Sequence, residues 1–298
     1  MLAASAGGIK AGTLFGMVKS LFLEDPSQTD WEVCAGISAG SIVSAFVCQT
    51  KPSDPSGFAK KLAEFERRLL SPKFHPLTPW HSNSILNTVS AFLWHGSFYQ
   101  DGVESLVTQN LGPLHRRLQA GAFNLDTSKY ETLTTLRGVM ASSAVPVAFP
   151  TVEIKGQQYT DGSMAHWFPI VEIEAYVRRP GPKRVDLLMC YPLDREGFLR
   201  TGAVPTHRKM VHSMAETVSQ RNWLTYEADC ARLRALGAEI RPGVQYVKDL
   251  DWTLRIISPK LCPYSDFTHM SPSEMQRLIR EGMESVERKA EPLSLHIG

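Results

Sequence analysis

Apolar residues follow two kinds of pattern along this chain. Short continuous runs are typical of buried strands, and stretches in which apolar residues recur every three or four positions are typical of helices with one buried face. The apolar residues between Leu14 and Phe22 recur at helical spacing. A run at residues 31–35 predicts a buried strand, and residues 42–47 predict a buried helix soon after it. The segment between them therefore turns sharply from strand to helix.

The middle of the chain, residues 57–119, is mostly helical in pattern. Its apolar residues form two stripes, one over residues 58–69 and another over residues 85–93. The second stripe has Phe74, Trp80 and Trp94 nearby, and it is a candidate acyl-binding or interfacial surface because aromatic residues favour lipid interfaces. The alternative is that both stripes are ordinary core.

Strand patterns return at residues 151–154 and 157–160, with the dipeptide Lys155-Gly156 between them. Two strand patterns separated by two turn residues predict a hairpin. This hairpin delivers the dipeptide Asp161-Gly162 at its end.

The last third of the chain alternates strand and helix. Residues 185–190 and 252–257 predict buried strands, separated by a long helical stretch over residues 207–236. The final helix begins near Ser271-Pro272, because proline is favoured in the first turn of a helix. Strands interleaved with helices predict an α/β fold whose sheet is covered on both faces. No repeat or low-complexity tract divides the chain, so we expect one domain over residues 1–298.

Composition narrows the class of protein. The 298 residues are 43% hydrophobic and 21% charged, as in soluble globular proteins. The 32 basic and 30 acidic residues give a formal net charge of +2. No basic block stands out, so nucleic acid is not an expected partner. The five cysteines form no CxxC pair, which argues against a zinc site and a disulfide framework. Without a signal sequence or an apolar run of ~18 residues, we expect a cytoplasmic protein that meets a membrane only at its surface.

The first candidate for chemistry is the sequence Gly36-Ile37-Ser38-Ala39-Gly40. In this GxSxG pattern a nucleophilic serine occupies a tight strand-to-helix turn, and the glycines leave room for that turn. The predicted strand before it and helix after it are the context that the motif requires. The alternative is a small-residue turn that only packs tightly.

A serine that attacks a carbonyl needs hydrogen-bond donors for the resulting oxyanion. Backbone amides of the segment Ala6-Gly7-Gly8-Ile9-Lys10, ahead of a predicted helix, are candidate donors. The alternative is a plain glycine turn.

The serine also needs a base. Asp161 is a candidate, although Asp-Gly is a common turn dipeptide. None of the nine histidines has a context that marks it as a base.

Three blocks in order give the chain a resemblance to the patatin-like phospholipase family. The first two are AGGIKAG, similar to the family's glycine-rich oxyanion loop, and GISAGS, similar to its nucleophile elbow. The third and most specific is ASSAVP, followed by FP and by GQQYTDG. The resemblance implies a three-layer fold with a central, mostly parallel sheet flanked by helices.

The resemblance also implies residue roles. Ser38 is then the nucleophile, Asp161 the general base, and the amides of Gly7, Gly8 and Ile9 the oxyanion hole. Lys10, Gly36, Gly40 and Gly162 take supporting positions. No histidine, metal or cofactor is required.

The chain departs from the family pattern at several positions. Ala6 and Ala11 replace loop glycines, Ser163 replaces the small residue after Asp-Gly, and Trp167 stands where asparagine is common. Few residues precede the loop, so the first strand must be short. The alanines restrict φ and predict a less open or less active loop, whereas a short first strand predicts a looser oxyanion hole.

We therefore expect a lipid acyl hydrolase of phospholipase A or lysophospholipase type, acting on phospholipid or other acyl-ester lipid through an acyl-enzyme. A homo-oligomer or a protein activator is an expected form of regulation. Two alternatives stay open. One is a serine esterase or thioesterase whose Ser-Asp-His triad uses His207, His212 or His269. The other is a catalytically weak lipid-binding scaffold.

Overall fold

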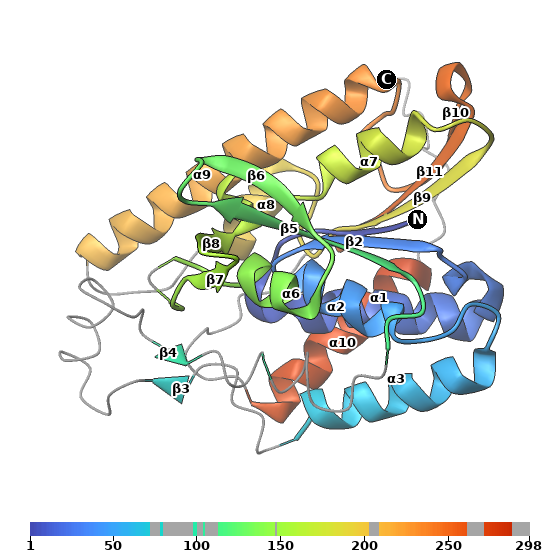
Figure 1. Ribbon diagram of the computed structural model, residues 1–298, viewed down its shortest axis with the longest axis horizontal. Helices are drawn as coiled ribbons and strands as arrows, with labels where there is room; N and C mark the ends of the chain where they lie inside the picture. Colours follow the sequence, from blue (N-terminus) through green and yellow to red (C-terminus); the bar gives the residue numbers. More distant parts are fainter. Residues whose placement is uncertain are drawn as a thin grey trace, which may run out of the picture.

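A computed structural model describes residues 1–71, 78–79, 98–99, 104, 113–146, 148–202, 209–260 and 271–287. A nine-stranded sheet lies at its centre (Figure 1). In spatial order its strands are β10 (Gly243–Val247), β11 (Trp252–Ile257), β9 (Lys183–Leu188), β1 (Leu2–Ala4), β2 (Val33–Ile37), β5 (Arg117–Asn124), β8 (Gln157–Asp161) and β7 (Val152–Ile154), with β6 (Lys129–Leu133) also paired to β5. Apart from it, β3 (Thr78–Pro79) pairs with β4 (Phe98–Tyr99).

The middle of this sheet is parallel. β11, β9, β1, β2 and β5 run in one direction, whereas β10, β6 and β8 pair antiparallel to their neighbours. The predicted mostly parallel sheet is confirmed. Connections between parallel strands cross the sheet faces, which places helices on both of them.

Helices form the two outer layers (Figure 1). On one face lie α1 (Ala11–Glu24), α2 (Ala39–Cys48), α3 (Pro55–Leu69), α6 (Leu136–Ser142) and α10 (Pro272–Glu287). On the other lie α7 (Ile170–Val177), α8 (Arg195–Gly202) and α9 (Lys209–Ala235). Four short 3-10 helices complete the description: η1 (Gly8–Lys10), η2 (Pro26–Thr29), η3 (Gly162–Met164) and η4 (Lys248–Leu250). The predicted three-layer arrangement is confirmed.

The two strands that lead into the candidate site are buried along their whole length. β1 is only three residues long, as expected, yet it pairs with β2 on one side and with β9 on the other. The Ser5 amide extends this pairing by donating to the Leu188 carbonyl at 3.0 Å. The short strand is therefore fixed at the centre of the sheet.

Several expected elements have the predicted type. The hairpin of β7 and β8 turns at Lys155 and Gly156, whose φ angles of 52° and 79° are those of a two-residue hairpin turn. The first apolar stripe, on α3, is buried. The second stripe, over residues 85–93, and Phe74, Trp80 and Trp94 lie outside the described residues.

The sequence reading was wrong for the region around β5. Residues 117–119 were expected to be helical, but they begin β5, and β6 was missed as well. The buried positions of β5 hold Leu118, the polar Asn124 and three small residues, Ala120, Gly121 and Ala122. Small residues produce little hydrophobic alternation, so the strand pattern was weak. β10 was also missed because it is partly exposed, with Val244 61% exposed.

Four cysteines, Cys34, Cys48, Cys190 and Cys230, are buried and form no disulfide. Among the described residues, no group of three or more His, Cys, Asp or Glu side chains is arranged to hold a metal ion. No helix in the described ranges is both long and apolar enough to cross a membrane.

Candidate active site

The register of the sheet brings Ser38 and Asp161 to neighbouring positions along β5. β2 pairs with β5 up to Ile37, which lies opposite Gly121. The next residue of β5, Ala122, lies opposite Asp161 at the end of β8. Ser38 directly follows Ile37, so the predicted nucleophile and the predicted base leave two strand ends at the same place.

Ser38 occupies a strained turn between β2 and α2. Its φ of 54° and ψ of −121° lie outside the regions that L-residues favour, and such a conformation costs about 1–3 kcal/mol. Hydrogen bonds hold the turn. The Ser38 amide donates to Ser142 Oγ at 3.0 Å, and the Ser41 hydroxyl donates to the Ser38 carbonyl at 2.7 Å. This is the tight strand-to-helix junction that the GxSxG spacing predicts.

The two glycines of this motif are required by close backbone packing. A Cβ at Gly36 would lie 2.2 Å from the carbonyl of Gly40. A Cβ at Gly40 would lie 2.2 Å from the carbonyl oxygen of Ala4 at the end of β1. The first turn of α2 therefore rests directly on β1 and β2.

Asp161 is fully buried, and burial raises the pKa of its carboxyl from 3.8 to about 6. The Ser163 amide, which donates to Oδ1 at 2.8 Å, and the Ser38 hydroxyl both lower this pKa by stabilising the charged form. None of the hydrogen bonds of the described residues reaches Oδ2. The Ser38 hydroxyl therefore acts on the carboxylate from close by without forming a hydrogen bond of standard geometry, and Oδ2 is left with free acceptor capacity.

The glycine loop follows β1 and reaches the same edge of the sheet, because β1 and β2 are parallel neighbours. Gly8 has a φ of 55°, a conformation that glycine adopts without strain. In the described part of the chain, the amides of Gly7 and Gly8 have no hydrogen-bond acceptor. The next amide, of Lys10, donates to the Gly7 carbonyl at 3.1 Å and closes the turn. Ile9 lies between them in η1.

Ala6, the first departure from the family pattern, anchors this loop on two sides. Its amide donates to the Trp167 carbonyl at 2.8 Å, and its own carbonyl accepts from the Cys190 thiol at 3.0 Å. A Cβ at Gly7 would lie 2.1 Å from Cys190 Sγ. The Ala6 amide is therefore not available to an oxyanion, and the available donors start at Gly7.

Lys10 is buried, with 1% exposure, and its Nζ lies 4.3 Å from the centroid of the Tyr191 ring. A cation over an aromatic face is attracted by the ring quadrupole. The side chain of Lys10 therefore packs against Tyr191 in the core. Gly162 is buried as well, and a Cβ there would lie 2.2 Å from the Gly121 oxygen.

Sequence reasoning assigned no role to Ser142 or to the Ala144 carbonyl, although both lie in the ASSAVP block. Ser142 Oγ accepts from the Ser38 amide. The Ala144 carbonyl accepts from the Asp161 amide at 3.0 Å and from the Thr160 hydroxyl at 2.7 Å. One segment thus holds both candidate catalytic residues. The presence of ASSAVP between the other two motif residues, Ser38 and Asp161, was the sequence signal that could have indicated these contacts.

The triad alternative depends on histidines whose side chains lie outside the described residues. His207 and His269 lie outside the described residues, and so does the side chain of His212. His166, five residues after Asp161, contacts Asp229 through Nδ1 at 2.7 Å and Arg232 through Nε2 at 3.4 Å. Both ring nitrogens are thus engaged away from Ser38.

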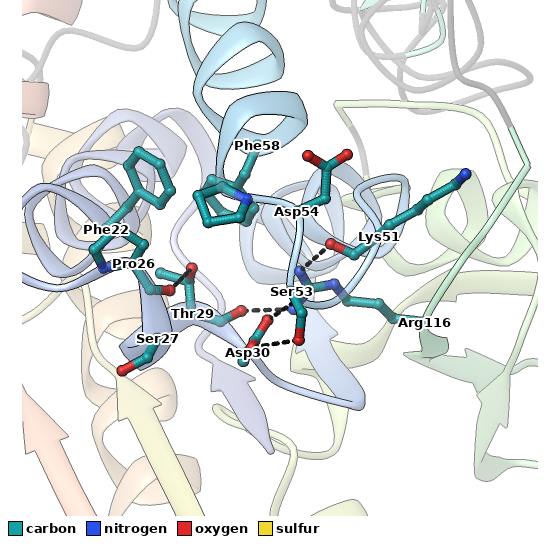
Figure 2. A pocket seen from close by; sticks show the side chains of 11 residues that line it. Phe22, Pro26, Ser27, Thr29, Asp30, Lys51, Ser53, Asp54, Phe58 and Arg116 are labelled. Atoms are coloured by element: carbon teal, nitrogen blue, oxygen red, sulfur yellow. Dashed lines mark hydrogen bonds between the residues drawn. The ribbon is translucent and has the colours of Figure 1, made fainter.

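A cavity of about 220 Å³ lies at the end of β2 opposite Ser38 (Figure 2). Arg116 lines it and donates hydrogen bonds to the carbonyls of Thr29, Trp31 and Thr50. Because its guanidinium ties the segment of Thr29 and Trp31 to that of Thr50, Arg116 stabilises this end of the sheet. The cavity has no connection to the candidate catalytic residues.

Comparison with known proteins identifies the family of this chain. Residues 2–173 match the family model described as patatin-like phospholipase. The match covers more than half of the chain and includes the glycine loop, Ser38 and Asp161, so the chain belongs to the patatin-like phospholipase family. Among solved structures, VipD from Legionella pneumophila aligns with a TM-score of 0.42 and 11% sequence identity, over 96% of this chain and 65% of VipD. The chain therefore spans about two thirds of the length of VipD. No curated protein matches the chain.

Proposed function

We propose that this protein is a lipid acyl hydrolase that cleaves fatty-acyl esters of phospholipids or related lipids through Ser38 and Asp161. The observation that carries the proposal is the register of β5, which sets a strained serine beside a buried carboxylate with a free acceptor oxygen. Family membership supports a lipid ester as the substrate.

The reaction begins when Asp161 accepts the hydroxyl proton of Ser38 and Oγ attacks the ester carbonyl carbon. The tetrahedral intermediate collapses as the bond to the alcohol breaks, and the alcohol leaves with the proton held by Asp161. The fatty-acyl group then remains on Ser38. Water attacks this acyl-enzyme while Asp161 takes its proton, and the fatty acid leaves as that proton returns to Ser38 Oγ.

Backbone groups provide the stabilisation of the negative charge. We assign the oxyanion hole to the amides of Gly7, Gly8 and Ile9, because Gly7 and Gly8 have no acceptor in the described part of the chain. Helix α2 begins at Ala39, directly after Ser38, so the positive end of its dipole faces the same reaction centre.

A carboxylate is a competent base here because its pKa is raised. Carboxyl groups in water have a pKa of about 4, so their carboxylates are weak bases. A carboxyl group with a pKa of about 6 accepts a proton more readily and is still mostly ionised at pH 7. The reaction as written needs no histidine, metal or cofactor.

The test is fatty-acid release from mixed phospholipid vesicles by the wild type, Ser38→Ala and Asp161→Asn. We expect either substitution to lower the rate by roughly a thousandfold or more. Ser20→Ala on α1 and Asp186→Asn on β9 are matched controls, because both replace buried residues on elements away from the dyad. These controls should retain activity within a few-fold. Circular dichroism establishes that each variant is folded.

Two results would contradict the proposal. If Asp161→Asn keeps its activity while substitution of His207, His212 or His269 removes it, a triad esterase is the correct description. If the folded wild type releases no fatty acid but binds the vesicles, the protein is a lipid-binding scaffold.

A further inference from the structure

Asp229, on helix α9, binds three consecutive residues of the segment that follows the catalytic aspartate. Its Oδ2 accepts from the Trp167 amide at 2.6 Å and from the Phe168 amide at 3.4 Å. Its Oδ1 lies 2.7 Å from Nδ1 of His166. The side chain is only 1% exposed. Charged carboxylates are rarely this buried unless donors satisfy them, and here three donors do so.

The segment that Asp229 binds connects the two halves of the candidate site. On its N-terminal side it continues from Asp161 through η3, where the His166 amide donates to the Gly162 carbonyl at 3.1 Å. On its other side the Trp167 carbonyl accepts from the Ala6 amide, which begins the oxyanion loop. A single carboxylate therefore lies at the point where the loop of the base and the loop of the oxyanion hole meet.

The neighbours of His166 favour one tautomer of its ring. Arg232 donates from Nη1 toward His166 Nε2 at 3.4 Å, and a guanidinium can only donate. Nε2 is therefore the acceptor, and Nδ1 carries the proton that it donates to Asp229. Arg232 is held in place by Glu174 of α7 at 2.9 Å.

We propose that Asp229 is a positioning residue that holds the loop of Asp161 and the oxyanion loop in one arrangement. The inference rests on the proposed function, because positioning matters only where Ser38 and Asp161 perform the reaction. Asp229 touches neither of them. It acts through the backbone at Trp167, the position where the chain departs from the family's asparagine.

An asparagine in place of Asp229 cannot hold the two loops in this way. Its single oxygen can still accept from the Trp167 amide, but its NH₂ group then faces Nδ1 of His166. His166 would have to move its proton to Nε2, where that proton points at the Arg232 guanidinium. Asp229→Asn therefore breaks the arrangement with almost no change in volume.

The experiment compares Asp229→Asn with Asp186→Asn. Asp186 is a matched control because it is fully buried and accepts from Trp31 Nε1 at 2.6 Å and from Arg255 Nε at 2.7 Å, away from both loops. We expect Asp229→Asn to lower kcat on a soluble fatty-acyl ester roughly tenfold to a hundredfold with little change in KM. Asp186→Asn should leave kcat within a few-fold of the wild type, even if it lowers the urea midpoint as much as Asp229→Asn does.

Hydrogen–deuterium exchange supplies a readout that does not depend on activity. In Asp229→Asn we expect faster exchange in peptides covering residues 5–12 and 161–169, and in Asp186→Asn we expect no change there. Equal kcat and equal exchange in the two variants would overturn the proposal. If the wild type has no hydrolase activity but the exchange difference is present, the proposed function fails and the catalytic consequence of positioning fails with it, whereas the structural link between Asp229 and the two loops stands.

A measurement on the wild type covers the case in which Asp229→Asn does not fold. The amides of Ala6 and Trp167 should exchange slowly, because each donates to a buried acceptor. The amides of Gly7 and Gly8 should exchange fast. Exchange of Ala6 and Trp167 at the rate of the two glycines would contradict the link.

Discussion

Asp161 shows how one residue's surroundings determine the proposed chemistry. Its carboxyl is fully buried, and only Ser38 and Ser163 favour its charged form. The pKa is therefore higher in the folded chain than in the unfolded chain. A carboxyl with this sign of shift binds its proton more tightly when folded, so its contribution to folding becomes more favourable as the pH falls from 6 toward 4.

This sign predicts an acid limit of activity that is separate from acid unfolding. Asp161 must be ionised to accept the proton of Ser38, so kcat/KM should fall tenfold per pH unit below about pH 6. The measurement is a rate profile between pH 4.5 and 8, with circular dichroism at each pH. The fold should persist at pH 5, where activity is already low. A profile that stays flat down to pH 4.5 would show that Asp161 is not the base.

At the scale of elements, the crossing of α1 and α10 depends on glycine. A Cβ at Gly16 would lie 2.0 Å from the Ile279 carbonyl oxygen, and one at Gly282 would lie 2.0 Å from the Thr13 carbonyl oxygen. The two backbones therefore approach more closely than any side chain permits. This contact fixes α10 against the helix that begins directly after the oxyanion loop.

The crossing predicts that Gly16→Ala destabilises the protein, although alanine favours helices by about 1 kcal/mol over glycine. The added methyl forces the two helices apart, and overpacking of this kind costs typically 1–3 kcal/mol. Urea unfolding measures the difference. Leu23→Ala on the same helix is the control, because Leu23 is 62% exposed and should change stability by less than about 0.5 kcal/mol. Equal stability of Gly16→Ala and wild type would show that α10 does not pack here.

At the scale of the whole molecule, the candidate site is assembled by parallel neighbours. The glycine loop follows β1, and Ser38 follows β2, so both leave the same edge of the sheet. Asp161 lies at the end of β8, which runs in the opposite direction. β8 pairs with β5 from Ala122 onward, directly after the last residue of β5 that pairs with β2. Helix α9 lies on the other face of the sheet from α1 and α2 (Figure 1). Its Asp229 binds the segment that follows Asp161.

The topology also predicts that residues 1–298 unfold as one domain. β1, from the start of the chain, is central in the sheet, and α10, from its end, packs on α1. Neither β1 nor α10 can leave without exposing the core. Tryptophan fluorescence and far-ultraviolet circular dichroism should therefore report one coincident urea transition. Two separated transitions would contradict the single domain.

The sequence alone determined the local parts of this protein. Periodicity and turn residues are local signals, so they predicted the strand at residues 252–257, the hairpin at Lys155-Gly156 and the turn around Ser38. The three ordered blocks gave the family. Tertiary structure decided which of these parts meet. β5 was invisible because small buried residues carry no alternation, yet its register is what places Ser38 beside Asp161.

Asp229 shows the same limit more strongly. It lies 68 residues after Asp161 on a helix with no motif, and nothing in its neighbours along the chain marks it. Its role depends on burial and on the direction of three hydrogen bonds, and both exist only once α9 covers the sheet. Sequence patterns report which surfaces each element buries, whereas contacts between distant elements are settled only when those surfaces pack.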